Sequence, residues 1–313
     1  MANPPDATAR VRGPRRPDRR QLVRAAYRLG WRHGGRLPRP VVRIVAALAA
    51  RVVVARDGLH VRQLRQNLTV LTGYPADAAL LRAGIASYVR TFWEVLALPR
   101  WTRADVLERA ELVNARAVHE AFGTTGAVIA LPHSGNWDLA GAWACLNGMP
   151  VTSVAEQLGA AEYAAFLAFR EGLGMEILSH RAPDLVDALV EAVGRRRLVC
   201  LMADRNFTGR GVEVDFAGRR VRMPAGPAQV ARRSGAALIP TVGHYSGGPL
   251  GRGSRLRLVL GPVVPAQPGD DGLVAMVQAC ADFFHAQLRR HPEDWHLMQP
   301  FFDVPVRTPA TVA

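Results

Sequence analysis

Apolar residues recur with a helical rhythm in the first third of the chain. Between residues 78 and 98 they follow a period close to 3.6, which is typical of a helix that buries one face. The positions are Leu80, Leu81, Ile85, Tyr88, Val89, Phe92, Trp93 and Leu96. We therefore predict that residues 58–112 are largely helical.

Short apolar runs replace this rhythm from about residue 124. Runs of this length that end at turn residues are typical of buried strands. We predict strands at 127–131, 151–155, 198–203, 212–216, 237–242 and 256–260, and helices at about 160–173, 183–195 and 271–290. Strands that alternate with helices predict an α/β fold, with a mostly parallel central sheet flanked by helices and a helical N-terminal region.

Positive charge is concentrated at the N-terminus. Residues 1–66 hold 16 Arg and 3 Asp, whereas the rest of this +14 chain is close to neutral. Residues 1–20 are rich in Arg and Pro and lack an apolar signal core, so we predict a disordered basic tail. Beyond it, Arg recurs at steps of three or four residues among apolar side chains, which predicts amphipathic helices broken near Gly34, Gly35 and Pro38.

These helices have two interpretations. Either they pack on the domain and turn their charged face to solvent, or they form a membrane-docking surface. The clustered charge favours docking on an anionic membrane. No apolar run reaches the roughly 18–20 residues of a spanning helix. We therefore expect a 21–112 docking region packed on a 113–313 α/β domain, in a monomeric protein bound peripherally to the cytoplasmic face of the cell membrane.

Composition excludes several chemistries. The chain has no Lys, which excludes a P-loop lysine, a Schiff-base lysine and a Ser–Lys pair. Cys145, Cys200 and Cys280 lie far apart in apolar stretches, so buried thiols are expected rather than disulfides or a zinc site. No G-x-S-x-G motif occurs, which argues against a serine hydrolase. Aromatic residues are not interleaved with the Arg run beyond Tyr27 and Trp31, so nucleic acid is not an expected partner.

The most informative segment is residues 131–139, Leu-Pro-His-Ser-Gly-Asn-Trp-Asp-Leu. It follows a predicted buried strand, and ligands in open α/β sheets bind at the carboxyl ends of strands. His133 lies at such an end, and Asp138 follows five residues later. A tight turn can return this carboxylate to the imidazole, which would fix its tautomer and raise its basicity. An isolated histidine and aspartate at this spacing are also common by chance.

The wider context resembles one family. Residues 132–138 resemble the signature of the bacterial lipid A lauroyl/myristoyl acyltransferases, whose actinobacterial branch is the phosphatidylinositol mannoside acyltransferases. Further stretches agree across about residues 60–303, although Asn206 departs from the acidic residue often found there. These stretches are 88–94 with 98–99, 154–157 with 169–175, 203–205 with 211–227, and 294–299.

The resemblance implies an acyl transfer in which His133 is the general base. Asp138 or Asp204 would orient it, and the spacing does not decide between them. Backbone amides of the 133–138 turn, or an arginine, would stabilise the oxyanion. The residues assigned to substrate binding are Asn136, Glu156, Arg170, Arg205 and Arg222. Trp295 and His296 are expected to be packing residues.

We therefore predict an O-acyltransferase that moves a fatty acyl chain from acyl-CoA to a phosphatidylinositol mannoside. Acyl-CoA is a co-substrate, and no cofactor and no metal are expected. The expected partners are anionic membrane lipids and the glycolipid acceptor. The alternatives are a lipid A-type acyltransferase that uses acyl carrier protein and a non-catalytic basic membrane-binding protein.

Overall fold

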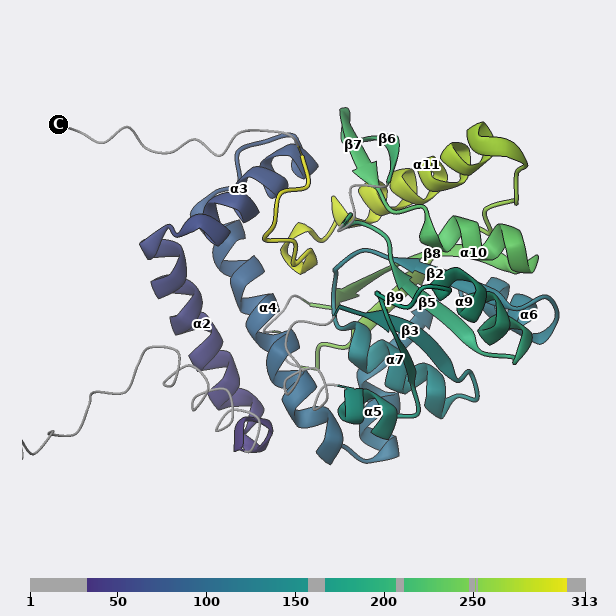
Figure 1. Ribbon diagram of the computed structural model, residues 1–313. Helices are drawn as coiled ribbons and strands as arrows, with labels where there is room; N and C mark the ends of the chain where they lie inside the picture. The colour runs from purple at the N-terminus through teal and green to yellow at the C-terminus, as the bar shows by residue number, and fades with distance from the viewer. Residues whose placement is uncertain (1–32, 157–166, 207–210, 248–250, 252, 303–313) are drawn as a thin grey trace, which may run out of the picture.

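A computed structural model describes residues 33–156, 167–206, 211–247, 251 and 253–302 (Figure 1). The predicted tail and the first predicted amphipathic segment, residues 1–32, lie outside the described residues. Within the described part of the chain, no helix combines the length and the apolarity needed to cross a bilayer.

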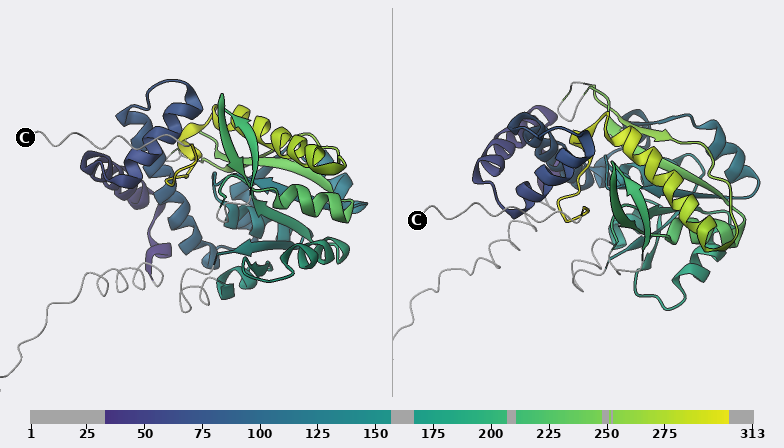
Figure 2. Two further views of the ribbon diagram at one scale, coloured as in Figure 1. Left: turned by 45° about the horizontal axis from the view of Figure 1, so that its top comes forward. Right: turned by 90° about the horizontal axis from the view of Figure 1, so that it is seen from above.

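Three helices form the N-terminal region from residue 39 onward, within the part of the chain that the structure describes. A short 3₁₀ turn, η1 (Gly34–Arg36), precedes them, where the sequence predicts a break. The helices are α2 (Arg39–Arg56), α3 (Leu59–Thr72) and α4 (Ala78–Ala97). The Asp77 side chain caps α4 by accepting a hydrogen bond from the Leu80 amide at 2.7 Å. Helix α4 lies between α2 and the α/β part (Figure 1, Figure 2).

A seven-stranded sheet forms the centre of the rest of the chain. Its order is β1-β9-β8-β2-β5-β3-β4, and every pair is parallel except the antiparallel pair β8–β9. The strands are β1 (Ala110–Val113), β2 (Ala127–Leu131), β3 (Val151–Ala155), β4 (Glu176–Ser179), β5 (Leu198–Met202), β8 (Ala237–Tyr245) and β9 (Leu256–Leu260). This confirms the predicted fold class.

Helices cover both faces of the sheet. On one face lie α5 (Arg103–Arg109), α6 (Arg116–Gly123) and α7 (Trp137–Leu146); on the other lie α9 (Leu185–Gly194), α10 (Gly226–Ser234) and α11 (Gly269–Leu288). Short 3₁₀ turns, η2 (Leu98–Arg100) and η3 (Pro292–Asp294), follow α4 and α11. The strands β6 (Val212–Phe216) and β7 (Arg219–Met223) form a separate antiparallel hairpin beside α11.

One continuous core joins the N-terminal helices to the sheet. Leu64 of α3 and Leu81 of α4 are fully buried in the same cluster as Val128 of β2 and Phe284 of α11. The predicted boundary after residue 112 falls inside β1, which pairs with β9. The N-terminal helices therefore pack as part of the same folded body.

Candidate active site

The turn between β2 and α7 is fixed by its neighbours. Gly135 has a φ of +60°, and a Cβ there would lie 2.9 Å from the carbonyl carbon of Gly243, so only glycine fits. The Ser134 hydroxyl accepts a hydrogen bond from the Gly243 amide at 3.2 Å. Asn136 then caps α7 by accepting from the Leu139 amide at 3.0 Å. These contacts set the direction in which the preceding residue, His133, leaves the sheet.

His133 is paired with Asp204. Strands β2 and β5 are parallel neighbours, so the residues after them meet at one edge of the sheet, called the carboxyl edge below. The His133 Nδ1 atom lies 2.6 Å from Asp204 Oδ1, and the His133 amide donates to Oδ2 at 2.8 Å. With Nδ1–H held by the carboxylate, the Nε2 atom carries the lone pair. Nε2 has no hydrogen-bonding partner among the described residues, and the imidazole is 20% exposed.

Asp204 is held as a buried carboxylate. Burial would raise its pKa, but the proximity of His133 and the hydrogen bonds from His133 and Trp295 lower it below the ordinary value for Asp. The Trp295 indole N–H donates to Asp204 Oδ2 at 3.0 Å. The two oxygens of Asp204 are therefore occupied by donors that favour its ionised form.

Residues 294–296 run along the turn and secure it from the other side. The Asp294 carbonyl accepts from the Gly135 amide at 3.0 Å, and the His296 amide donates to the His133 carbonyl at 2.8 Å. Trp295 and His296 are buried, as expected of packing residues. The sequence did not indicate that Trp295 also hydrogen-bonds the partner of His133.

Asp138 has a different partner from the one that the spacing suggested. It forms a buried ion pair with Arg170, whose Nε lies 2.6 Å from Asp138 Oδ1. Among the described residues, Asp138 and His133 make no hydrogen bond or ion pair. Asp138 is directed to this arginine because α7 carries it away from the imidazole, while the residues after β5 bring Asp204 up to it. Of the two candidate acids, Asp204 is therefore the one on His133.

An apolar pocket lies between α7 and the sheet, beside His133. The space in it that no atom fills is about 840 Å³, which includes open solvent at its mouth. It is lined from the carboxyl ends of the strands, at Leu131 and Met202, to their amino ends, at Leu198. Trp137 lines the pocket and packs edge-on against His133, with ring centroids 5.6 Å apart. The charged residues in the described lining are Asp138 and Arg170.

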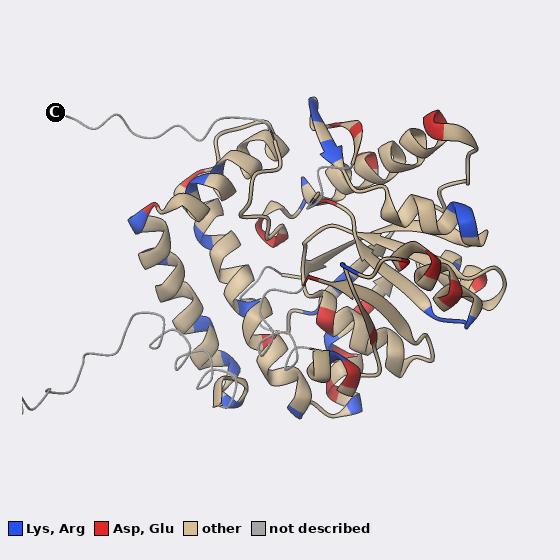
Figure 3. Cartoon of the chain, in the orientation of Figure 1, with Lys and Arg blue, Asp and Glu red and all other residues tan. Residues whose placement is uncertain are grey.

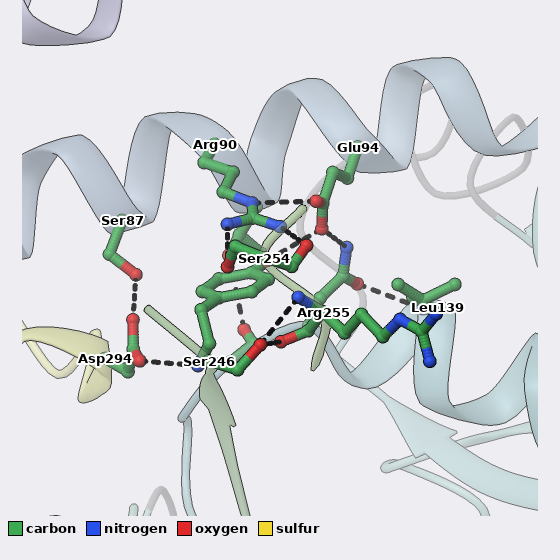
Figure 4. A network of polar contacts seen from close by, with 12 residues as sticks. Ser87, Arg90, Glu94, Leu139, Ser246, Ser254, Arg255 and Asp294 are labelled. Carbon is green, nitrogen blue, oxygen red and sulfur yellow. Dashed lines mark hydrogen bonds and ion pairs between the residues drawn. The ribbon is translucent and has the colours of Figure 1, made fainter. Parts of the chain in front are cut away.

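A buried polar network ties α4 to the turn (Figure 4). Glu94 accepts from Arg90 at 2.8 Å, from the Asn136 amide group at 3.0 Å and from the Tyr245 hydroxyl at 2.7 Å. Asn136 is 1% exposed, and its two side-chain polar atoms are occupied by Leu139 and Glu94. In this structure the side chain holds the turn, and its assignment to substrate binding stays a prediction.

The same network extends to Asp294. Its carboxylate accepts from the Ser87 hydroxyl at 2.5 Å and from the Tyr245 amide at 2.7 Å. Burial raises the Asp294 pKa to about 7, against the opposing effect of these hydrogen bonds. The predicted helix pattern did hold a signal for this cluster, because Ser87, Arg90 and Glu94 are polar residues on the buried face of α4.

The remaining assigned residues are not gathered at His133. The Glu156 carboxylate lies 3.9 Å from the Arg205 guanidinium, with which it forms an ion pair. Arg205 directly follows Asp204, which keeps this pair near the carboxyl edge. Arg222 lies on the β6–β7 hairpin and pairs with Glu213 at 2.5 Å. Its assignment to substrate binding stays a prediction.

The comparisons with known proteins agree with the sequence resemblance. The profile of the bacterial lipid A biosynthesis acyltransferases matches residues 14–303. A phosphatidylinositol mannoside acyltransferase of Mycolicibacterium smegmatis is 38% identical over 289 residues, which cover 90% of this chain and 91% of that protein. One of Mycobacterium tuberculosis (strain CDC 1551 / Oshkosh) is 38% identical over 286 residues, covering 88% and 87%. Within the described ranges, no three His, Cys, Asp or Glu side chains are grouped to hold a metal ion.

Proposed function

This chain belongs to the bacterial lipid A biosynthesis acyltransferase family and is an acyltransferase, and we propose that it transfers a fatty acyl group from acyl-CoA to a hydroxyl of a phosphatidylinositol mannoside. The observation that carries the proposal is the His133–Asp204 pair, whose imidazole packs against Trp137 in the wall of an apolar pocket. This transfer requires a base that activates the hydroxyl, next to an apolar site that holds the acyl chain. Family membership removes the alternative of a non-catalytic basic protein.

His133 acts as the general base in this mechanism. Its Nε2 atom accepts the proton of the acceptor hydroxyl while the oxygen attacks the thioester carbonyl carbon. The tetrahedral intermediate collapses, the C–S bond breaks, and the imidazolium returns the proton to the departing CoA sulfur. Asp204 stabilises the imidazolium through Nδ1–H and keeps Nε2 directed at the substrate. Trp295 supports Asp204 through its indole N–H.

The oxyanion needs donors that the fold has not already used. The Ser134 and Gly135 amides donate to the Pro132 and Asp294 carbonyls, so these parts of the turn do not serve. The positive end of α7 begins directly after the turn, at Trp137. We assign the stabilisation of the developing negative charge to the first turn of α7.

The apolar pocket holds the acyl chain. Between Leu198 and Met202 it runs along β5, a span of roughly 13 Å at about 3.3 Å per residue. The buried Asp138–Arg170 pair lines it and anchors α7 over the sheet. This pair therefore shapes the binding site instead of handling the proton.

Membrane docking is assigned to the N-terminal helices. One face of α2 leaves large apolar side chains exposed at helical spacing: Val41 (41%), Ile44 (61%), Val45 (49%), Leu48 (54%) and Val52 (48%). This set is called the apolar face of α2. Arginines occur along α2, α3 and α4, whereas acidic residues are concentrated in the α/β part (Figure 3). An exposed apolar face flanked by arginines favours the surface of an anionic leaflet.

The proposed location follows from the substrates. The acceptor is a lipid and the donor is water-soluble, so the enzyme works at a membrane surface. We assign it to the cytoplasmic face, where acyl-CoA is present, as a monomeric peripheral protein.

A donor–acceptor matrix tests the reaction. The purified full-length protein is incubated with acyl-CoA or with acyl carrier protein loaded with the same chain. The acceptor is phosphatidylinositol mannoside or a lipid A precursor, and products are identified by mass spectrometry. We expect acylated phosphatidylinositol mannoside from acyl-CoA. Product from the carrier protein alone, or on the lipid A precursor alone, would replace the proposal with the lipid A-type alternative.

A further inference from the structure

A second cavity lies away from the acyl pocket, between the start of α2 and the middle of α4. It encloses about 820 Å³, counting space that is open to solvent. Arg39 and Arg43 line it from α2, and Arg90, Trp93 and Glu94 line it from α4. This set is called the α2–α4 cavity. Its lining shares no residue with the acyl pocket, and it shares Arg90 and Glu94 with the polar network around the turn.

Two arginines in the walls of this cavity carry positive charge that no described residue neutralises by an ion pair. Glu94 is already committed to Arg90, Asn136 and Tyr245. Among the described residues, Arg39 and Arg43 make no ion pair or hydrogen bond. Partial burial lowers the Arg39 pKa, and the nearby positive charges of Arg109 and Arg90 lower it further, although Glu94 opposes them. An anion in the cavity would relieve this crowding.

Two groups of unused hydrogen-bond donors lie at the same place. The Trp93 indole N–H is buried and has no acceptor among the described residues. Helix α2 begins at Arg39 with no side-chain cap and no acidic residue in its first turn. The Arg39 backbone N–H and the positive end of the helix dipole therefore lie at the cavity, whereas Pro40 has no N–H and the Val42 N–H donates to the Pro38 carbonyl. Arginines, an indole N–H and a helix start together suit the oxygens of a phosphate.

The cavity also adjoins the apolar face of α2. Val41 and Ile44 of that face lie between and just after the two arginines in the sequence, and both are exposed. A phosphate in the cavity would thus stand at the point where the apolar face begins. We propose that the α2–α4 cavity binds the phosphate of an anionic membrane phospholipid, whose acyl chains lie beside the apolar face of α2. This inference rests on the proposed membrane docking and names the lipid group that the docking region recognises.

The test compares two pairs of arginines on one helix in the full-length protein. R39Q/R43Q removes two charges from the cavity. R51Q/R56Q removes the same charge from exposed positions of α2 that make no ion pair among the described residues. Binding to vesicles of phosphatidylcholine alone or with phosphatidylinositol is measured by cosedimentation, and circular dichroism checks folding. We expect R39Q/R43Q to weaken binding to the anionic vesicles roughly tenfold more than R51Q/R56Q, because it loses charge-assisted hydrogen bonds as well as charge.

The outcomes separate this inference from the proposed docking. Suppose that the two variants lose vesicle affinity equally while wild-type binding stays selective for anionic vesicles. This result would overturn the assignment of the cavity to a lipid phosphate and leave the docking intact. Equal binding of the wild type to neutral and anionic vesicles would overturn the electrostatic docking itself. Inorganic phosphate forms a third arm. If it bound as tightly as the vesicles and lost this affinity in R39Q/R43Q, the occupant would be a free anion and the lipid assignment would fall.

Discussion

The carboxyl edge buries charged side chains, whereas the apolar face of α2 exposes apolar ones; each is the reverse of what is usual in a globular protein. At the carboxyl edge, charged groups are buried and each has a partner: Asp204 has His133 and Trp295, and Glu94 has Arg90. On α2, apolar side chains such as Ile44 and Leu48 are exposed without a cover among the described residues. Buried polar groups need partners to be tolerated, and exposed apolar stripes persist where another surface covers them.

The difference separates two tasks that one chain performs. The paired groups at the carboxyl edge hold a fixed geometry for chemistry, which demands preorganisation. In the proposed docking, the exposed apolar side chains of α2 are covered from outside, by lipid. Helix α4 connects the two regions, because it packs on α2 and also carries Ser87, Arg90 and Glu94 into the network around the turn (Figure 4). Substitutions in one region should therefore change one function and spare the other.

The largest effect is expected from His133→Ala. Loss of the general base should lower the acyl transfer rate by about 10²–10⁴-fold. Vesicle binding should be unchanged, because the imidazole is not part of the apolar face of α2. Transfer is followed with labelled acyl-CoA, and cosedimentation is measured on the same preparation. A folded variant with the wild-type rate would contradict the assignment of the base.

The reverse pattern is expected from I44Q/L48Q/V52Q. Removing three apolar side chains from α2 should weaken vesicle binding by at least roughly tenfold, because each inserted aliphatic side chain contributes on the order of 1 kcal/mol or more. The rate with a short-chain, water-soluble acceptor should be retained. V263Q/V274Q, which changes exposed valines outside α2, serves as the control. Equal vesicle binding by both variants would refute docking through α2.

A smaller effect is expected from Trp295→Phe. The ring still fills its site, but Asp204 loses one donor, and the kcat should fall roughly tenfold, the cost of one hydrogen bond to a charged group. The Asp204 pKa is lowered in the folded protein, so its contribution to stability is present above the ordinary pKa of Asp and is lost as the pH falls through the folded value. Without the indole N–H the folded pKa should rise toward the ordinary value, so this loss should be smaller and should be complete at a higher pH, as urea unfolding at several pH values would reveal. Trp101→Phe, away from Asp204, should change neither property.

The smallest effect is expected from Asp294→Asn, as a change in pH dependence. The folded pKa of about 7 exceeds the ordinary value of 3.8, so the folded state binds more protons between these values. The stability from this carboxyl is fully present below the ordinary pKa and is lost as the pH rises through about 7. Relative to the wild type, the variant should lack this decline in the free energy of unfolding. An identical pH dependence in both proteins would show that Asp294 titrates normally.

The sequence predicted most of the fold because its patterns are local. The runs at 127–131 and 198–203 are buried on both faces of a parallel sheet, so they are apolar throughout. Strands β1 and β4 were missed because their residues are mostly half-buried and their runs are short. The run at 212–216 was predicted as a strand of the same series, but its polar residues alternate outward and it forms a hairpin with β7.

The site was predicted less completely because it depends on contacts between distant residues. The position of His133 followed from the end of a strand. Its partner did not. Asp138 precedes an apolar segment and Asp204 follows another, 66 residues later, and neither pattern shows which carboxylate reaches the imidazole. Only the pairing of β2 with β5 brings Asp204 to the imidazole. Asn136 was assigned to substrate because it lies in the signature, yet in the fold it caps α7 and binds Glu94.

The central claim is that His133 works with Asp204 and not with Asp138, which is nearer to it in the sequence. The most direct test compares the kcat of D204N and D138N, each corrected for the fraction of folded enzyme. We predict a loss of roughly 10²-fold or more for D204N, since the imidazole loses the group that fixes its tautomer. D138N should mainly lose stability, because it weakens the buried pair with Arg170. A D138N protein that is folded but as inactive as His133→Ala, beside a D204N protein that keeps its rate, would contradict the account.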